Sequence, residues 1–164
     1  MMEAGLRAED VLRLLKTNWA GRTLYCLAEV DSTNLRLKEM GRAGAQHGCV
    51  VIADHQTAGR GRMARALQEN PCEGLLISVL ARLGDVPPDQ LPTLALVTSL
   101  AVSDACLAQN VTAGIKWPND LTWGGRKFCG MLLELGIDEA GRRFAVAGIG
   151  INANGRPEGE GLHA

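Results

Sequence analysis

The stretch "LTWGGRKFCGMLLEL", residues 121–135, decides the fold class of this chain. Two apolar runs flank the pair Gly124-Gly125, and such a pair between apolar runs is typical of the two-residue turn of a β-hairpin. The segment "FAVAGIGINAN", residues 144–154, is another apolar run and predicts the final strand. The C-terminal half of the chain is therefore expected to consist mainly of strands.

Extended and helical patterns alternate in the rest of the chain. Apolar and β-branched runs predict strands at 23–30, 49–56 and 74–82. Helices are predicted at 8–19, from an N-cap at Asp31 or Ser32 to about Arg42 with a stop at Gly44, and at 92–109 with Asn110 as the cap. A turn is expected at 118–120. Because hairpins are mixed with helices, we expect an α+β fold in which helices flank a mixed β-sheet.

The composition is that of a globular chain, since 46% of its 164 residues are hydrophobic and 21% are charged. The net charge is −1, so no overall basic field attracts nucleic acid, and we expect no nucleic-acid partner. No apolar run approaches the roughly 18 residues of a membrane span, and the start of the chain lacks the pattern of a signal peptide. We therefore expect a cytoplasmic protein with no membrane partner.

Five cysteines are spread along the chain without a CxxC pair, at positions 26, 49, 72, 106 and 129. The odd number and the spacing argue against a disulfide framework and against a zinc site. We expect small buried thiols in a reducing compartment.

An arginine-glycine segment, "QTAGRGRMARAL" at 56–67, follows the predicted strand at 49–56. Gly59 and Gly61 allow a close approach of backbone to ligand, and Arg60 and Arg62 suit contact with phosphate or carboxylate. The segment does not complete the GxGxxG fingerprint, and the chain has no GxxxxGK[ST] motif. An anion clamp and a solvated basic turn both remain open as interpretations.

Four more short segments, which we call polar islands, lie between or at the ends of the apolar runs: "DSTN" (31–34), "KWPND" (116–120), "RKFCG" (126–130) and "GIGINAN" (148–154). The first could hold a polar ligand at a helix N-terminus or could simply cap the helix. Lys116 lies beside a tight turn, and Lys127 stands where an apolar strand begins, so that burial of its charge would need an anionic partner. Either lysine could equally be a solvated charge.

Together these islands resemble the catalytic domain of biotin protein ligases, over residues 23–154. The resemblance implies a mixed sheet flanked by helices, a fold that the family shares with lipoate ligases. It also implies a two-step reaction: biotin and ATP form biotinyl-AMP with release of pyrophosphate, and a lysine of a biotin carboxyl carrier protein then takes the biotinyl group. Such a reaction needs positive charge and positioning more than a general base, because the attacking carboxylate is already ionised at neutral pH.

The resemblance assigns roles residue by residue. Biotin is assigned to Ser32, Thr33, Asn34, Gln56, Gly59, Arg60, Lys127, Gly130 and Gly148. ATP is assigned to Arg62, Lys116, Asn119 and Asn152, with Mg²⁺ near Asn152. Lys127, Arg60 and Arg62 are the expected catalytic residues.

Two positions depart from the family pattern, because Ala64 replaces a loop glycine and Leu67 replaces the tryptophan that the resemblance places on adenine. Three functions stay open: a biotin protein ligase, a ligase-like module that binds biotin or its adenylate with little turnover, and a lipoate-type acyl ligase. We expect one catalytic domain over residues 1–164, with its core at about 23–154 and without an N-terminal DNA-binding domain or a C-terminal small β-barrel. Homodimer formation is left open.

Overall fold

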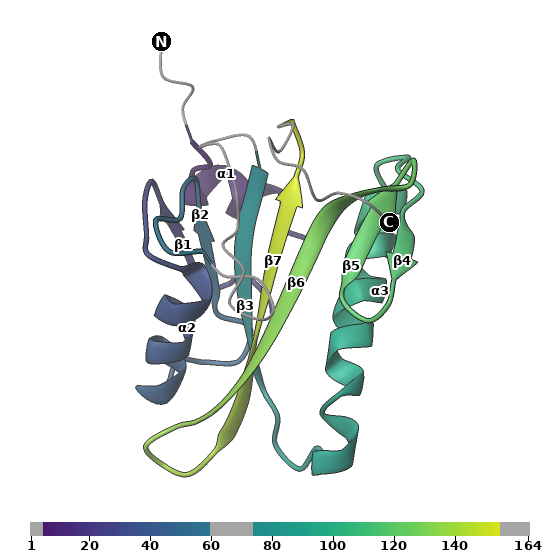
Figure 1. Cartoon of the computed structure of the whole chain (residues 1–164). Coiled ribbons are helices and arrows are strands. Elements are labelled where there is room, and N and C mark those ends of the chain that lie inside the picture. Colours follow the sequence, from purple (N-terminus) through teal and green to yellow (C-terminus); the bar gives the residue numbers. More distant parts are fainter. Residues whose placement is uncertain (1–4, 60–73, 155–164) are drawn as a thin grey trace.

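Seven strands form a mixed sheet in the order β1-β2-β3-β7-β6-β5-β4 in the computed structural model, which describes residues 5–59 and 74–154 (Figure 1). The strands are β1 (Leu24–Leu27), β2 (Val50–Ala53), β3 (Gly74–Arg82), β4 (Gly114–Lys116), β5 (Asp120–Trp123), β6 (Arg126–Ile137) and β7 (Arg143–Asn152). The helices are α1 (Ala8–Leu14), α2 (Thr33–Arg42) and α3 (Thr93–Leu107), with a short 3₁₀ helix η2 (Pro88–Gln90). The predicted α+β class, with helices flanking a mixed sheet, is confirmed.

Strands β1 and β2 are the parallel pair of this sheet, and the other neighbouring strands are antiparallel. Parallel neighbours need a crossover connection, and α2 provides it. The predicted strands at 23–30 and 49–56 are too long, because regular pairing ends at Leu27 and Ala53. Beyond that point a single parallel bridge joins Val30 to Gln56. This bridge brings Gln56 beside the residues that begin α2.

The hairpin predicted at Gly124-Gly125 is confirmed as the connection between β5 and β6. Both glycines have positive φ, 56° and 77°, as the favoured two-residue turn requires. Strand β4 was not predicted; it is three exposed residues long, so it carries no apolar alternation.

The helix boundaries follow their capping residues. Ser32 is the N-cap of α2, and Gly44 follows its end with φ 95°, as predicted. Asn110 follows α3 with a positive φ of 62° and ends that segment. The predicted helix at 8–19 is wrong in length, because α1 ends at Leu14 and buries no residue that would stabilise further turns. No helix in the described parts of the chain is long and apolar enough to cross a membrane.

Helices α2 and α3 pack on opposite faces of the sheet. Leu37 of α2 packs with Leu80, Phe144 and Val146 on what we call the α2 face. Val102 of α3 packs with Leu121, Cys129 and Met131 on the α3 face. In Figure 1, α2 lies at the β1–β2 end of the sheet and α3 passes behind β4 and β5. Each helix therefore covers only part of its face, and neither helix of the described residues reaches the α2 face over β5 and β4.

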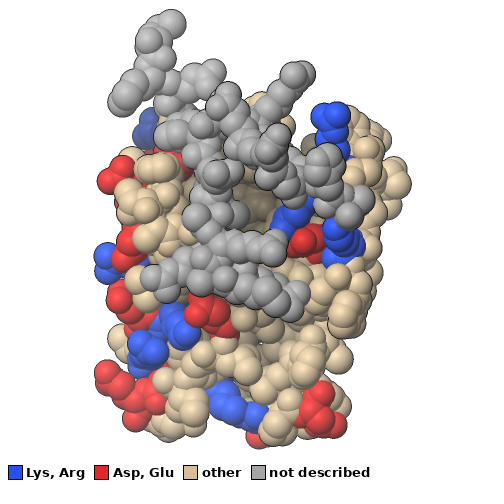
Figure 2. Space-filling view, in the orientation of Figure 1, with Lys and Arg blue, Asp and Glu red and all other residues tan. Residues whose placement is uncertain are grey.

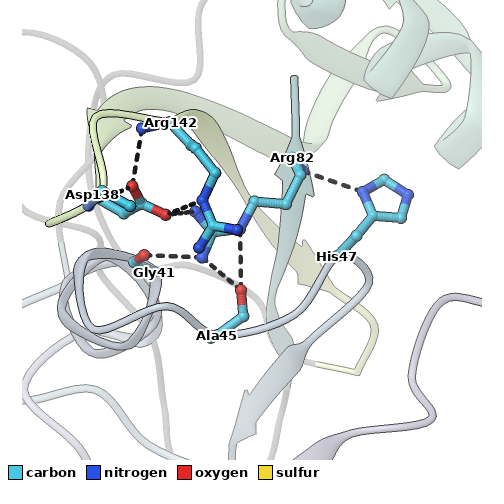
Figure 3. Close-up of polar contacts among 7 residues, drawn as sticks. Gly41, Ala45, His47, Arg82, Asp138 and Arg142 are labelled. Atoms are coloured by element: carbon cyan, nitrogen blue, oxygen red, sulfur yellow. Dashed lines mark hydrogen bonds and ion pairs between the residues drawn. The ribbon is translucent and has the colours of Figure 1, made fainter. Parts of the chain in front are cut away.

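A half-buried arginine ties the C-terminal end of α2 to the sheet (Figure 3). The guanidinium of Arg82 donates to the carbonyls of Gly41 and Ala45 and pairs with Asp138 at 2.9 Å. It also lies 5.3 Å from the ring centre of Phe144. A cation at a helix C-terminus satisfies carbonyls that have no partner within the helix. Arg82 therefore fixes where α2 lies along the sheet.

The carboxylate of Asp138 is the counterion of this cluster and organises the turn between β6 and β7. It accepts from the backbone N–H groups of Arg142 (2.8 Å) and Ala140 (3.0 Å) and pairs with the Arg142 side chain at 2.9 Å. These contacts, the Arg142 N–H first, outweigh burial and hold the pKa of Asp138 below its usual value.

This lowered pKa predicts an acid-dependent loss of stability. A carboxylate whose pKa is lower in the folded state stabilises the fold above its unfolded pKa, about 3.9, and loses that contribution as the pH falls through the folded value. Asp138→Asn should lower the melting temperature at pH 7, and the gap to the wild type should close below about pH 4. Asp85→Asn, at an exposed carboxylate, is the matched control. An equal gap at pH 7 and pH 3 would contradict the assignment.

Candidate functional site

Glycines form the floor of a site on the α2 face. The strand register aligns Lys116, Asp120, Gly130 and Gly150 in one row across β4, β5, β6 and β7. The next row on this face contains Leu132, Gly148 and Ser78. Because directly paired residues share a face, Gly130 and Gly150 leave backbone open on this face, whereas the side chain of Asn34 covers Gly148 there. Two of them, Gly130 and Gly148, are predicted biotin residues.

The N-terminus of α2 forms one wall of this site. Gln56 Oε1 accepts from Thr33 N at 2.7 Å and lies 2.9 Å from Thr33 Oγ1. Ser32 Oγ accepts from Leu35 N at 3.4 Å, so its capping role is confirmed, and its hydroxyl proton remains available to a ligand. The structure thus brings Ser32, Thr33 and Gln56 together, although 23 residues separate Thr33 from Gln56.

Asn34 lies behind this wall and its amide is fully engaged. Its Nδ2 donates to Leu132 O at 3.2 Å and to Glu134 Oε2 at 3.1 Å. Its Oδ1 lies 2.6 Å from Ser78 Oγ. Asn34 therefore lies beside the predicted biotin residues as a support, and its amide could bind a ligand only by giving up these bonds.

Lys127 reaches the α2 face because of a β-bulge. Cys129 pairs with Leu121, but Lys127 pairs with Thr122, so Phe128 is an extra residue in β6. Without the bulge, the period of two would place Lys127 with Cys129 on the α3 face. With it, Lys127 Nζ lies 3.1 Å from where a Cβ of Gly130 would be. A bulge that re-aims a side chain is frequent beside functional sites.

Asp120 is the anionic partner that the sequence pattern demanded for Lys127. Asp120 Oδ1 lies 2.8 Å from Lys127 Nζ. Within the described residues this buried oxygen makes no directed hydrogen bond, so the contact is an ion pair. Lys127 is still 44% exposed and can contact a ligand. Lys116 stands next in the same row, at the exposed edge strand.

The two predicted asparagines of the nucleotide site lie in different settings. Asn119 is buried, and its Nδ2 donates to Met131 O at 2.7 Å, which ties the turn before β5 to β6. Asn152 is the last residue of β7 and pairs with Gly74, so it is in line with Gly150 and Gly148 on the α2 face. The structure brings Asn152 to the floor of the site and leaves Asn119 mainly at its edge.

Cys129, one residue from Gly130, is not an activated nucleophile. Burial, followed by the neighbouring Cys106 and Asp120, raises the pKa of its thiol to about 12, while Lys127 acts in the opposite sense. A reactive cysteine needs a lowered pKa. The described residues contain no group of three or more His, Cys, Asp or Glu side chains that could hold a metal ion.

The arginines of the predicted loop, Arg60 and Arg62, lie outside the described residues, and so do Ala64 and Leu67. Gly59 is the last described residue before them and is half-buried. Ala58 N donates to Asp31 O at 2.8 Å, so the described start of this segment runs beside the α2 wall. The roles assigned to Arg60 and Arg62 therefore stay predictions.

The charged part of the site is visible in Figure 2, which has the orientation of Figure 1. A hollow opens in the middle of this view, and Lys or Arg side chains with an Asp or Glu side chain stand along its right-hand side. In Figure 1 that side of the sheet carries β6, β5 and β4. Because β7 lies between β3 and β6, Ser78 and Lys127 are two strand spacings, ~10 Å, apart across the sheet. An elongated ligand with a polar head and an anionic end fits this spacing.

A separate cavity of about 300 Å³ lies between α3, the turn at Pro118 and the sheet. Most of its lining is apolar, including Ala95, Met131, Leu133 and Ala147. It shares Gly148 and Asn119 with the predicted site residues, but no charged residue lines it. Most of the predicted site residues that the structure describes gather on the α2 face instead.

Sequence reasoning missed several contributors to this site. Ser78, Asp120, Glu134 and Gly150 were not predicted, although Asp120 and Gly150 stand inside the quoted motifs "KWPND" and "GIGINAN". Ser78 had a local signal, because it is the one hydroxyl in the apolar run "GLLISVLA". A buried hydroxyl in a central strand needs a partner.

Comparisons with known proteins point to one family. A model described as "Biotin/lipoate A/B protein ligase family" matches residues 26–152. The bifunctional ligase/repressor BirA of Bacillus spizizenii is 36% identical over 152 residues, which are 92% of this chain and 46% of that protein. The biotin–[acetyl-CoA-carboxylase] ligase of Mycobacterium tuberculosis is 37% identical over 142 residues, which are 84% of this chain and 52% of that protein. The chain spans about half the length of these relatives.

Solved structures share the fold. Biotin protein ligase from Aquifex aeolicus in complex with biotin and ATP has a TM-score of 0.70 and 35% identity, and the match covers 86% of this chain and 56% of that one. A bipartite lipoate protein ligase from Thermoplasma acidophilum has a TM-score of 0.56 at 11% identity, which is a likeness of fold alone.

Replacing Gly148 or Gly130 by alanine should change the free energy of unfolding by different amounts. A Cβ at Gly148 would lie 2.2 Å from Asn34 Oδ1, whose side chain is held by three bonds. Gly148→Ala should therefore lower the free energy of unfolding by ~1–3 kcal/mol in denaturant titrations. At Gly130 the nearest atoms belong to the flexible end of Lys127. Gly130→Ala should change stability by less than about 1 kcal/mol, and an equal loss in both variants would contradict this account.

Proposed function

Because the chain belongs to the biotin/lipoate A/B protein ligase family, we propose that it activates biotin with ATP and transfers it to a lysine of a biotin carboxyl carrier protein. The observation that carries the proposal is the α2 face itself. Segments around residues 33, 56, 127 and 148 converge there, with hydrogen-bonding groups at one end and a lysine at the other. That arrangement suits a substrate with a urea-type head and a carboxylate tail.

In this proposal the biotin head binds at the α2 wall. Ser32, Thr33 and Gln56 supply hydroxyl and amide groups, and a buried urea needs such partners because each lost bond costs ~1–3 kcal/mol. The acyl chain runs past Asn34, which covers Gly148, toward the backbone of Gly130. Its carboxylate then lies beside Lys127.

Lys127 has the central electrostatic role in the first step. A carboxylate oxygen of biotin attacks the α-phosphorus of ATP, the bond to the β-phosphate oxygen breaks, and pyrophosphate leaves with its electron pair. Both reactants are anions, so a cation between them offsets their repulsion and the charge that develops. Asp120 holds Lys127 in place before the ligands arrive. The motif resemblance assigns Arg60 and Arg62 to the same task, which is to offset the negative charge of the two reactants.

Lys116, Asn119 and Asn152 are proposed to serve the nucleotide. Mg²⁺ commonly binds through substrate phosphates and one or two protein oxygens, and the described residues, which contain no carboxylate cage, fit that mode with Asn152 as the proposed protein ligand. Bound there, Mg²⁺ would neutralise phosphate charge.

In the second step the amine of a carrier lysine attacks the mixed anhydride and AMP leaves. The acceptor is proposed to be the carrier protein of a biotin-dependent carboxylase, because the Mycobacterium tuberculosis relative is named for such a carboxylase. A cytoplasmic location follows from the same proposal, since these carriers and ATP meet there.

Pyrophosphate release in the presence of biotin and ATP tests the proposal. Lys127→Ala should slow biotin-dependent release by roughly 100- to 1,000-fold, or ~3–4 kcal/mol, as for the loss of an oxyanion donor. Lys16→Ala, at an exposed lysine, is the matched control and should leave the rate unchanged.

Three outcomes would contradict the proposal. Release that depends on lipoate and not on biotin would assign the chain to the lipoate-type alternative. Equal rates in Lys127→Ala and Lys16→Ala would remove Lys127 from the reaction. Biotin binding without pyrophosphate release in the wild type would identify a binding module.

A further inference from the structure

Ser78 lies at the centre of a buried chain of hydrogen bonds that leads into the site. It is 0% exposed and lies on strand β3, beside the central strand β7. Its Oγ lies 2.8 Å from Thr33 Oγ1 and 2.6 Å from Asn34 Oδ1. On the outer side, Asn34 Nδ2 donates to Glu134 Oε2, and Glu134 Oε1 pairs with Lys38 at 2.8 Å.

Glu134, at the charged end, fixes the direction of the hydrogen bonds in this chain. An ionised carboxylate only accepts hydrogen bonds, so Glu134 and the carbonyl of Leu132 must face Asn34 Nδ2. Asn34 therefore presents Oδ1 to Ser78, and the single hydroxyl proton of Ser78 goes to Asn34. Ser78 Oγ is then left to accept, and Thr33 is the hydroxyl that can donate to it.

This direction leaves one contact without a proton. From Gln56 Oε1 through Thr33 and Ser78 to Asn34 Oδ1 there are three oxygen–oxygen contacts, of 2.9, 2.8 and 2.6 Å. The two hydroxyls supply only two protons. Ser78 has no access to solvent, whereas Gln56 is half-buried at the edge of the site. The contact without a proton is therefore the one between Thr33 Oγ1 and Gln56 Oε1.

We infer that Ser78 is a positioning residue that makes Thr33 Oγ1 and Gln56 Oε1 a paired acceptor selective for an N–H donor on the ligand. The inference rests on the proposed function and deepens it, because it names the feature that separates biotin from lipoate. The urea of biotin carries N–H groups that supply the missing proton, and the dithiolane of lipoate carries none. A donor-free head group would leave the two acceptors, Thr33 Oγ1 and Gln56 Oε1, facing each other without a proton between them.

Ser78→Ala tests the inference by isothermal titration. Without Ser78, the Thr33 proton turns to Gln56 Oε1, so a ligand N–H must displace that bond. The Kd for biotin should rise roughly 10-fold, as for a buried polar group that loses its partner, while the Kd for ATP stays unchanged. Ser99→Ala is the matched control, because Ser99 is also 0% exposed and hydrogen-bonded, but on α3.

A double-mutant cycle separates positioning from general destabilisation. If Ser78 acts through Thr33, then Ser78→Ala should add less than about 2-fold to the biotin Kd in a Thr33→Val background, because coupled residues are not additive. A merely structural role would give the same fold-change in both backgrounds and would overturn the inference.

Other outcomes are equally decisive. Wild-type biotin binding with an unchanged Kd in Ser78→Ala would overturn the inference alone, whereas a wild type that binds no biotin would overturn the proposed function itself. If Ser78→Ala does not fold, Glu134→Gln replaces it in the test. The new amide can donate as well as accept, so it no longer fixes which end of the Asn34 amide faces it. It should weaken biotin several-fold relative to Glu39→Gln on the exposed side of α2, and equal affinities would contradict the inference.

Discussion

The single extra residue in β6, Phe128, is the constraint on which the proposed site depends. Side chains alternate strictly along a strand, and the bulge is what transfers Lys127 from the α3 face to the face that carries Gly130 and Gly148. The rest of β6 keeps its register, so Cys129 and Met131 still complete the core under α3. One strand thus serves a core on one side and a charged site on the other.

The opposite wall depends on long-range contacts of another kind. Arg82 and Asp138 hold the C-terminal end of α2, Leu37 packs its middle against the sheet, and Asn34 and Thr33 bind Ser78 at its N-terminal end. A helix of ten residues has little stability of its own. Its N-terminus can present Thr33 to a ligand because these three contacts fix the helix along its whole length.

Local signals were sufficient for much of the fold. The Gly124-Gly125 turn, the Ser32 cap and the stop at Gly44 are short-range features, and the structure has each where the sequence predicts it. The resemblance carried by the motifs also assigned Thr33, Gln56, Lys127 and Gly148 to one biotin site. What the sequence could not provide was register: neither the bulge at Phe128 nor the parallel pairing of β1 with β2 has a local pattern.

Side-chain networks were the other gap. Ser78 and Glu134 are 56 residues apart in sequence, and their link through Asn34 exists only because β3, β7 and β6 are neighbours in the sheet. The same holds for Arg82 and Asp138. Such contacts join residues whose types are ordinary for their local positions, so only the assembled sheet distinguishes them from solvated charges or plain core residues.

The proposed site requires the ligand to bind on the α2 face between Thr33 and Lys127. A titration of the ¹⁵N-labelled chain with biotin, followed through the amide chemical shifts, locates the bound ligand. We expect shifts at the amides of Thr33, Gln56 and Gly130. Shifts confined to Ala95, Thr98 and Leu133, around the cavity under α3, would contradict it.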